Sequence, residues 1–196
     1  MQIARVEEHT SVEGPGIRTA VWLQGCSIGC SDCCNPEMHD SSRGERITAE
    51  ELADAVIHAR ADGLTLVGGE PLDQSGEVRE LLQILRSSGY HGIIMFSGYT
   101  WQQILADPAR MQAAALCDLV IAGPFDKSRS PGSRRWIGSD NQTLHFVTDF
   151  YSQLAENWPA FVKEIEIVIG DGEILVNGTP LSDEDELSGL LMVKGD

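Results

Sequence analysis

An alternation of short apolar segments with amphipathic ones runs along the chain as far as Gly123, and this feature most constrains the fold. The apolar segments predict strands over Thr19–Gly25, Leu64–Pro71, Gly92–Gly98 and Cys117–Gly123. The segments between them predict helices over 48–63, 75–89 and 108–117. Strands that alternate with helices are typical of a parallel sheet covered by those helices. The sequence therefore predicts an α/β fold, and a length of 196 residues predicts one domain.

The helix over 48–63 carries start and stop signals of its own. Thr48 is predicted to cap it, and Glu51 stands three residues later, which is the spacing of a capping box. Leu52 and Val56 mark one apolar face, and Gly63 is predicted to end the helix.

After Gly123 the chain becomes polar and rich in glycine and proline. A loop as long as 123–143 is usually functional or mobile, and its basic cluster at 127–135 either docks a partner or is merely solvated. The segment Glu164–Gly178 predicts a small C-terminal β-hairpin with Asp171-Gly172 at its turn. Residues 180–196 predict a flexible acidic tail.

The charge balance limits the partners of this chain. Lys and Arg total 14 against 30 Asp and Glu, so the net charge is −16, which repels phosphate backbones and argues against a nucleic-acid partner. No apolar run is long enough to span a bilayer, and the N-terminus lacks a signal-peptide pattern. We therefore expect a cytoplasmic protein with no membrane partner, in a compartment where disulfides seldom persist.

Four of the five cysteines lie within nine positions, and three of them form a Cys-x3-Cys-x2-Cys pattern: Cys26, Cys30 and Cys33. Cysteine thiolates hold iron–sulfur clusters, and three ligands leave one iron open to a substrate. A structural zinc ion is the alternative, with Cys34 or His39 as the fourth ligand. A later cysteine, Cys117, precedes a predicted strand and is expected to be a small buried side chain.

A second motif, Gly-Gly-Glu-Pro at Gly68–Pro71, follows a predicted strand. Together with the cysteine pattern it resembles the radical S-adenosylmethionine (SAM) superfamily. The segment Ser11–Cys26 resembles the one before the cluster in glycyl-radical activating enzymes, with Glu13 where aspartate is common. The segments at 96–100, 117–126 and 134–142 make the chain most similar to the anaerobic ribonucleotide reductase activating proteins.

This resemblance implies a fold and two cofactors. The fold is a partial (β/α) barrel of parallel strands forming a single radical SAM domain over 1–196, with the cluster loop at the carboxyl end of the first barrel strand. The three patterned cysteines are implied to hold a 4Fe-4S cluster, whose open iron binds SAM.

The resemblance also implies a set of binding residues. The Gly-Gly-Glu-Pro element is implied to place the methionine part of SAM, and Ser97 is a candidate for its ribose or carboxylate. The implied cofactor-binding residues are Asp32, Cys33, Cys34, Asn35, Gly68, Gly69, Glu70, Pro71 and Ser97. Asp32 and Cys34 depart from the family pattern: Asp32 either accepts from the adenine or points to water, and Cys34 is a structural thiol, an alternative ligand or a redox hazard. A lip near the substrate is implied for Gly14, Gly16 and Arg18.

The activity that the resemblance implies is that of an activating enzyme. A flavodoxin-type donor reduces the cluster, SAM is cleaved to a 5′-deoxyadenosyl radical, and this radical takes a hydrogen atom from a glycine of a partner glycyl-radical enzyme. The alternative is a stand-alone radical SAM enzyme that modifies a small molecule or peptide directly. A non-catalytic zinc-binding module is a third possibility.

Overall fold

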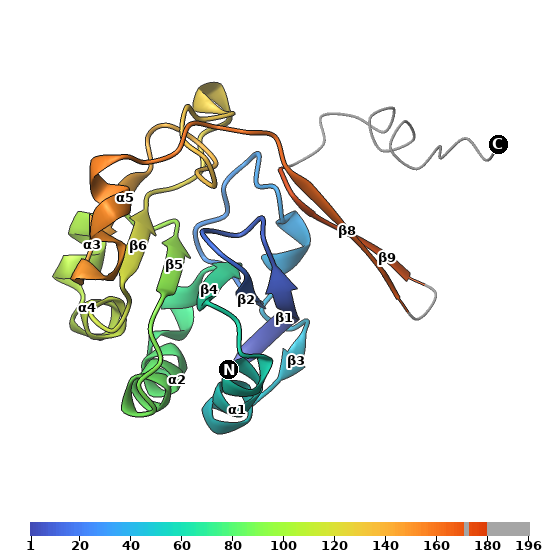
Figure 1. Ribbon diagram of the computed structural model, residues 1–196, viewed down its shortest axis with the longest axis vertical. Coiled ribbons are helices and arrows are strands. Elements are labelled where there is room, and N and C mark those ends of the chain that lie inside the picture. Colours follow the sequence, from blue (N-terminus) through green and yellow to red (C-terminus); the bar gives the residue numbers. More distant parts are fainter. Residues whose placement is uncertain (171–172, 180–196) are drawn as a thin grey trace.

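A computed structural model describes residues 1–170 and 173–179 of the chain (Figure 1). Its main sheet has seven strands in the order β3-β1-β2-β4-β5-β6-β7 within this described part. The strands are β1 (Gln2–Thr10), β2 (Arg18–Leu23), β3 (Glu45–Arg46), β4 (Gly63–Gly68), β5 (Ile93–Ser97), β6 (Leu119–Ala122) and β7 (Thr143–Phe146). The helices are α1 (Ala49–Ala59), α2 (Ser75–Ser87), α3 (Trp101–Ala106), α4 (Pro108–Ala114) and α5 (Ser152–Glu156).

The centre of the sheet is parallel, as the alternation of strands and helices predicts. The strands β2, β4, β5 and β6 pair side by side in parallel, and each falls on a predicted strand. The outer strands are antiparallel: β1 pairs with β2 and with β3, and β7 pairs with β6. The α/β prediction is therefore confirmed for a mostly parallel sheet, whereas β1, β3, β7, α3 and α5 were not predicted. The partial barrel stays a prediction.

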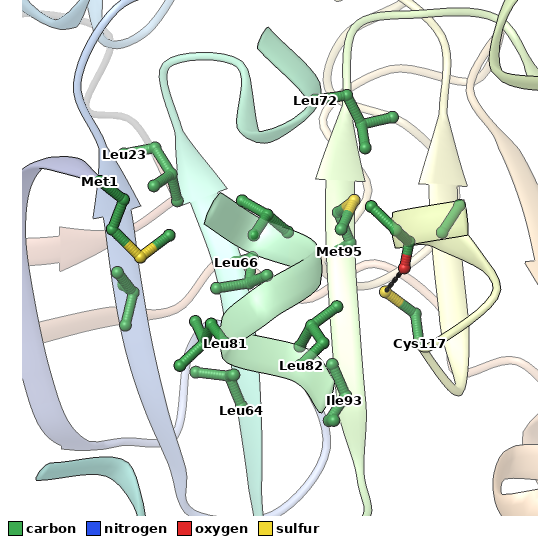
Figure 2. Close-up of a cluster of buried hydrophobic side chains, with 14 of the residues drawn as sticks. Met1, Leu23, Leu64, Leu66, Leu72, Leu81, Leu82, Ile93, Met95 and Cys117 are labelled. Atoms are coloured by element: carbon green, nitrogen blue, oxygen red, sulfur yellow. Dashed lines mark hydrogen bonds between the residues drawn. The ribbon is translucent and has the colours of Figure 1, made fainter. Parts of the chain in front are cut away.

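A hydrophobic core fills the space between this sheet and the helices α1, α2 and α4 (Figure 2). Leu81 of α2 lies beside Leu64 and Leu66 of β4, Leu82 lies toward Ile93 of β5, and all five side chains are fully buried. Burying a leucine side chain stabilises a fold by about 1.5–3 kcal/mol. Cys117 belongs to the same core, with 0% exposure, so its predicted role as a small buried side chain is confirmed.

The predicted capping box of α1 is present. The Thr48 hydroxyl accepts from the Glu51 amide, and the Glu51 carboxylate accepts from the Thr48 amide. The prediction that Gly63 ends this helix is wrong, because α1 ends at Ala59 and Arg60 takes the left-handed cap conformation with φ 55°. Gly63 instead begins β4, where a Cβ atom would stand 2.3 Å from the carbonyl oxygen of Gly92, the residue before β5.

The C-terminal hairpin is also confirmed. Strands β8 (Ile165–Gly170) and β9 (Glu173–Gly178) pair antiparallel in a separate sheet that extends away from the main body (Figure 1). Its base is held by an ion pair between Arg135 and Glu164 and by a hydrogen bond from Asn177 to Thr10. The predicted turn at 171–172 and the predicted acidic tail at 180–196 lie outside the described residues. In the described ranges, none of the helices has the length and apolar character needed to cross a membrane.

Candidate functional site

The cysteine loop leaves the carboxyl end of β2 and is closed at its base by backbone hydrogen bonds. The amide of Gly25 donates to the carbonyl of Met38 at 2.8 Å, and the amide of Cys26 donates to the carbonyl of His39 at 3.2 Å. A short 3₁₀ turn at Pro36–Met38 brings the chain back toward the sheet. Ligands of parallel α/β sheets bind beyond the carboxyl ends of the strands. The loop therefore lies at the end of the sheet where a cluster was predicted.

The three patterned cysteines, Cys26, Cys30 and Cys33, are partly buried and form no disulfide. The amide of Asn35 donates to the Cys33 sulfur at 3.4 Å. A hydrogen bond with Cys34 lowers the pKa of the Cys33 thiol to about 5, whereas burial raises the pKa of Cys26. The loop therefore supplies three thiols, one of which favours the thiolate form, together with N–H groups that can donate to sulfur. This donor set fits a cysteine-ligated cluster.

Within residues 1–170 and 173–179, no group of three or more His, Cys, Asp or Glu side chains converges so as to hold a metal ion. Ligation by the three patterned cysteines therefore stays a prediction. The two residues considered as a fourth ligand for zinc, Cys34 and His39, both lie beside Cys33, since interactions with each of them lower the pKa of that thiol.

The Gly-Gly-Glu-Pro element packs directly on the base of the cysteine loop. The amide of Gly69 donates to the carbonyl of Leu23, and the amide of Glu70 donates to the carbonyl of Gly25, both at 2.8 Å. A Cβ atom on Gly69 would stand 2.3 Å from the Gly25 carbonyl oxygen, and one on Gly68 would stand 2.7 Å from the Leu23 amide nitrogen. Both positions need glycine for this close approach. The structure thus brings together the two motifs that were predicted to share a site.

The Glu70 side chain is buried and joins the ends of β4 and β5. Its carboxylate accepts hydrogen bonds from the Ser97 hydroxyl at 2.9 Å and from the amides of Leu72 and Gly98 at 2.9 and 2.7 Å. Burial raises the pKa of Glu70 to about 7, although these three donors oppose the shift. Ser97, predicted to contact SAM, is therefore placed beside the Gly-Gly-Glu-Pro element, and its hydroxyl is bonded to Glu70.

The raised pKa of Glu70 predicts a specific pH dependence of stability. Because the folded-state pKa of about 7 lies above the ordinary 4.5, the folded protein binds this proton more tightly than the unfolded chain does. The contribution of Glu70 is therefore fully present below pH 4.5 and is lost as pH rises to about 7. Relative to Glu70→Gln, the free energy of unfolding of the wild type should fall by roughly 3 kcal/mol across that window. Urea denaturation of the iron-free proteins from pH 5 to pH 8 checks this, and parallel pH profiles would contradict it.

Asp32, immediately before the third cysteine of the pattern, has an ion-pair partner in the basic loop. Lys127 Nζ lies 3.1 Å from Asp32 Oδ1, and this hydrogen bond is the main cause that lowers the pKa of Asp32. Both side chains are exposed, and exposed pairs of this kind contribute little to stability. The contact nevertheless places the basic loop against the cysteine loop, and contact of Asp32 with adenine stays a prediction.

Arg18, predicted to lie near the substrate, begins β2, whereas the cysteine loop follows the last residue of that strand. Five residues of strand separate these ends by roughly 17 Å. The Arg18 side chain is fully buried and donates to the Thr65 hydroxyl at 2.7 Å and to the Tyr151 hydroxyl at 2.8 Å. These contacts give Arg18 a structural role in the described fold, and its substrate role stays a prediction.

The two glycines of the predicted lip have backbone conformations that favour glycine. Gly14 has φ 142° and Gly16 has φ 77°, and a Cβ atom on Gly14 would stand 2.9 Å from the Arg18 side chain. The preceding Glu13 is the residue of this segment whose charge reaches the cysteine loop, since it contributes to raising the pKa of Cys34. Burial raises the pKa of Glu13 itself to about 7.

Three side chains that interact at the cysteine loop were missed by sequence reasoning: Ser27 in the loop, and Asp73 and Tyr99 beside it. The Asp73 carboxylate accepts from the Ser27 amide and hydroxyl and from the Tyr99 hydroxyl. The one available signal was the position of Asp73, two residues after the Gly-Gly-Glu-Pro element.

Comparisons with known proteins agree with this site. A family model described as a 4Fe-4S single cluster domain matches residues 12–145. The pyruvate formate-lyase-activating enzyme of Clostridium pasteurianum is 36% identical over 104 residues, which cover 50% of this chain and 44% of that protein. The anaerobic ribonucleoside-triphosphate reductase-activating protein of Enterobacteria phage T4 is 29% identical over 155 residues, 76% of this chain and 96% of that protein. The protein of the same name from Pasteurella multocida is 28% identical over 148 residues, 71% of this chain and 93% of that protein.

The fold, the cysteine loop and the matched region define an iron–sulfur protein, and the chain belongs to the 4Fe-4S single cluster domain family. The relatives confirm the predicted resemblance to the radical SAM activating enzymes, and with it the enzyme class and the two cofactors, a 4Fe-4S cluster and SAM. The chain spans less than half the length of the Clostridium relative but nearly the whole length of the phage relative.

Proposed function

We propose that this chain reductively cleaves SAM at a 4Fe-4S cluster and directs the reaction to a hydrogen atom on a glycine of a partner glycyl-radical enzyme. When bound, the cluster and SAM supply the one-electron cleavage of a sulfur–carbon bond. The observation that carries the proposal is the contact between the two motifs, in which the Glu70 amide donates to the Gly25 carbonyl, one residue before Cys26. A ligand that binds the open iron and the Gly-Gly-Glu-Pro element together requires this adjacency.

Most of the predicted cofactor-binding residues have a task in this proposal. Three thiolates, those of Cys26, Cys30 and Cys33, hold the cluster, and bare backbone at Gly68 and Gly69 receives the ammonium group of SAM. The Glu70 carboxylate is already bonded to Ser97 and to the Gly98 amide, so it fixes the shape of this backbone. Three neighbours of the third thiol, Asp32, Cys34 and Asn35, flank the bound SAM. The parallel strands would form the partial barrel that encloses it.

The proposed partners are a glycyl-radical enzyme and a flavodoxin-type electron donor, both met in the cytoplasm. Relatives named for the activation of pyruvate formate-lyase and of anaerobic ribonucleoside-triphosphate reductase support the first of these. The alignment with this chain covers 96% of the phage protein, which supports an activating protein about as small as that relative. Because the relatives activate different enzymes, the proposal stops at the class of the partner.

A stand-alone radical SAM enzyme is the second candidate, and the hairpin favours it. Strands β8 and β9 lie at 165–178, beyond the matched residues 12–145, so they are an addition to the matched domain. Such an addition would suit a small-molecule or peptide substrate held by this chain alone.

The test is anaerobic reconstitution with iron and sulfide, followed by SAM and dithionite, with 5′-deoxyadenosine as the measured product. The wild type should form the nucleoside, and the Cys26→Ala/Cys30→Ala/Cys33→Ala variant should form none. Stoichiometric zinc with no nucleoside in the wild type would overturn the proposal. If the nucleoside forms, adding a candidate glycyl-radical enzyme and recording its electron paramagnetic resonance spectrum separates the two candidates, since only an activating enzyme leaves a glycyl radical in its partner.

A further inference from the structure

Asp73 holds the first turn of the cysteine loop through two hydrogen bonds from Ser27, and it accepts a third from Tyr99. Its Oδ2 accepts from the Ser27 amide at 2.6 Å, and its Oδ1 accepts from the Ser27 hydroxyl at 2.9 Å and the Tyr99 hydroxyl at 2.6 Å. Ser27 directly follows Cys26, the first cysteine of the pattern. One carboxylate therefore fixes the backbone and the side chain of the residue next to a predicted cluster ligand.

The hydrogen bonds from Ser27 and Tyr99 to Asp73, called the clamp below, are supported by further contacts of Asp73 and Tyr99. Asp73 lies in a 3₁₀ turn (Pro71–Gln74), where its amide donates to the Glu70 carbonyl at 3.1 Å. Tyr99 is 8% exposed, its amide donates to Ser97 at 3.1 Å, and the Arg110 guanidinium lies 3.6 Å from its ring centroid. The segments that follow β4 and β5 thus both contact the cysteine loop. Asp73 joins them, because it follows β4 and bonds both to Tyr99 after β5 and to Ser27 in the loop.

The charge of Asp73 also reaches the first cysteine. Its two carboxylate oxygens accept from the amide and the hydroxyl of Ser27, the residue directly after Cys26, so the negative charge lies beside that cysteine. A nearby negative charge disfavours the addition of an electron to a cluster, and N–H groups that donate to its sulfur atoms favour it. By holding the Ser27 amide on its own carboxylate, Asp73 keeps that N–H group away from the sulfur.

We propose that Asp73 is a positioning residue that fixes the Cys26 end of the cluster loop and keeps the reduction potential of the bound cluster low. The inference rests on the proposed function, because it needs a cluster on this loop. A low potential suits a cluster that must pass an electron to a bound sulfonium, so the clamp serves the reductive cleavage proposed above. Asp73 acts through Ser27 and through its charge, and it is not a ligand.

The redox test compares one variant of Asp73 with a matched control and the wild type. Asp73→Asn removes the charge at nearly constant shape, and Asp54→Asn removes the same charge from an exposed position of α1. Reductive titration of the reconstituted proteins, followed by electron paramagnetic resonance, should show a more positive midpoint potential for Asp73→Asn than for the wild type and for Asp54→Asn. Equal potentials in all three would overturn the redox part of the proposal.

A second measurement on the iron-free protein tests the clamp without a cluster. Hydrogen exchange at the Ser27 amide should be at least tenfold faster in Asp73→Ala than in the wild type, whereas exchange in the core strand β4 should be unchanged. Unchanged exchange at Ser27 would overturn the clamp. If the wild type takes up no cluster, the proposed function fails, and the exchange result still decides whether Asp73 fixes the loop.

Discussion

Replacing Gly69 with alanine is expected to lower the free energy of unfolding by about 3 kcal/mol and to prevent cluster binding. The new Cβ atom would stand 2.3 Å from the Gly25 carbonyl oxygen and 3.1 Å from the Leu23 carbonyl oxygen. Both neighbours are backbone atoms, so no side chain can rotate away to make room. Relief requires the end of β2 and the start of the cysteine loop to move off the Gly-Gly-Glu-Pro element. This movement breaks the backbone hydrogen bonds from Gly69 to Leu23 and from Glu70 to Gly25.

The measurement is urea denaturation of the iron-free protein, together with the iron retained after reconstitution. Gly76→Ala is the matched control, because a Cβ atom there would meet nothing within 4 Å and Gly76 lies in α2. Alanine is the better helix former, so this control should be as stable as the wild type or slightly more stable. If Gly69→Ala had the same urea midpoint as the wild type, this result would contradict the close packing of the two motifs.

Replacing Arg18 with methionine is expected to cost at least about 3 kcal/mol of folding free energy. The fully buried guanidinium makes five hydrogen bonds, to the hydroxyls of Thr65 and Tyr151 and to the carbonyls of Pro15, Leu64 and Gly92. Methionine fills a similar volume but donates to none of these acceptors, although the Gly92 carbonyl keeps donors in the Tyr151 hydroxyl and the Leu64 amide. Each buried acceptor that is left without a donor costs about 1–3 kcal/mol.

Tyr151→Phe is the control for this second experiment, because it removes one partner of Arg18 and should cost only about 1 kcal/mol. Urea denaturation of the two iron-free variants gives the comparison. A stable Arg18→Met protein that cleaves SAM but does not act on its partner would contradict the structural role and favour the predicted substrate role.

Sequence reasoning was most successful where the signal is local. The capping box of Thr48 and Glu51 spans four residues, and each parallel strand is one apolar run between turns. Strand β1 was not predicted because its pairing with β2 shifts register between Ile3 and Arg5 and again between Glu7 and Thr10. Such irregularities break the two-residue alternation that marks a strand half-buried on one face.

The contacts that build the site connect residues far apart in sequence. Glu70 meets Ser97 across 27 residues, and Asp32 meets Lys127 across 95. Neither pair has a spacing that a sequence pattern marks, because tertiary packing alone brings them together. The end of α1 at Arg60 was missed for a related reason. A glycine is the usual signal for the end of a helix, but Gly63 is required by a tertiary contact, the close approach of the Gly92 backbone.

The burial of Cys117 gives the protein a built-in reference for chemical labelling. A thiol-specific alkylating reagent meets four cysteines in the loop that are at least partly exposed, whereas Cys117 is enclosed by the core and burial raises its pKa. Alkylation at Cys117 should therefore proceed only as fast as the domain opens, while alkylation at the loop reports whether its sulfur atoms are occupied. Mass spectrometry of one labelled sample then separates loss of the cofactor from loss of the fold, which is the distinction that work on an oxygen-sensitive enzyme most needs.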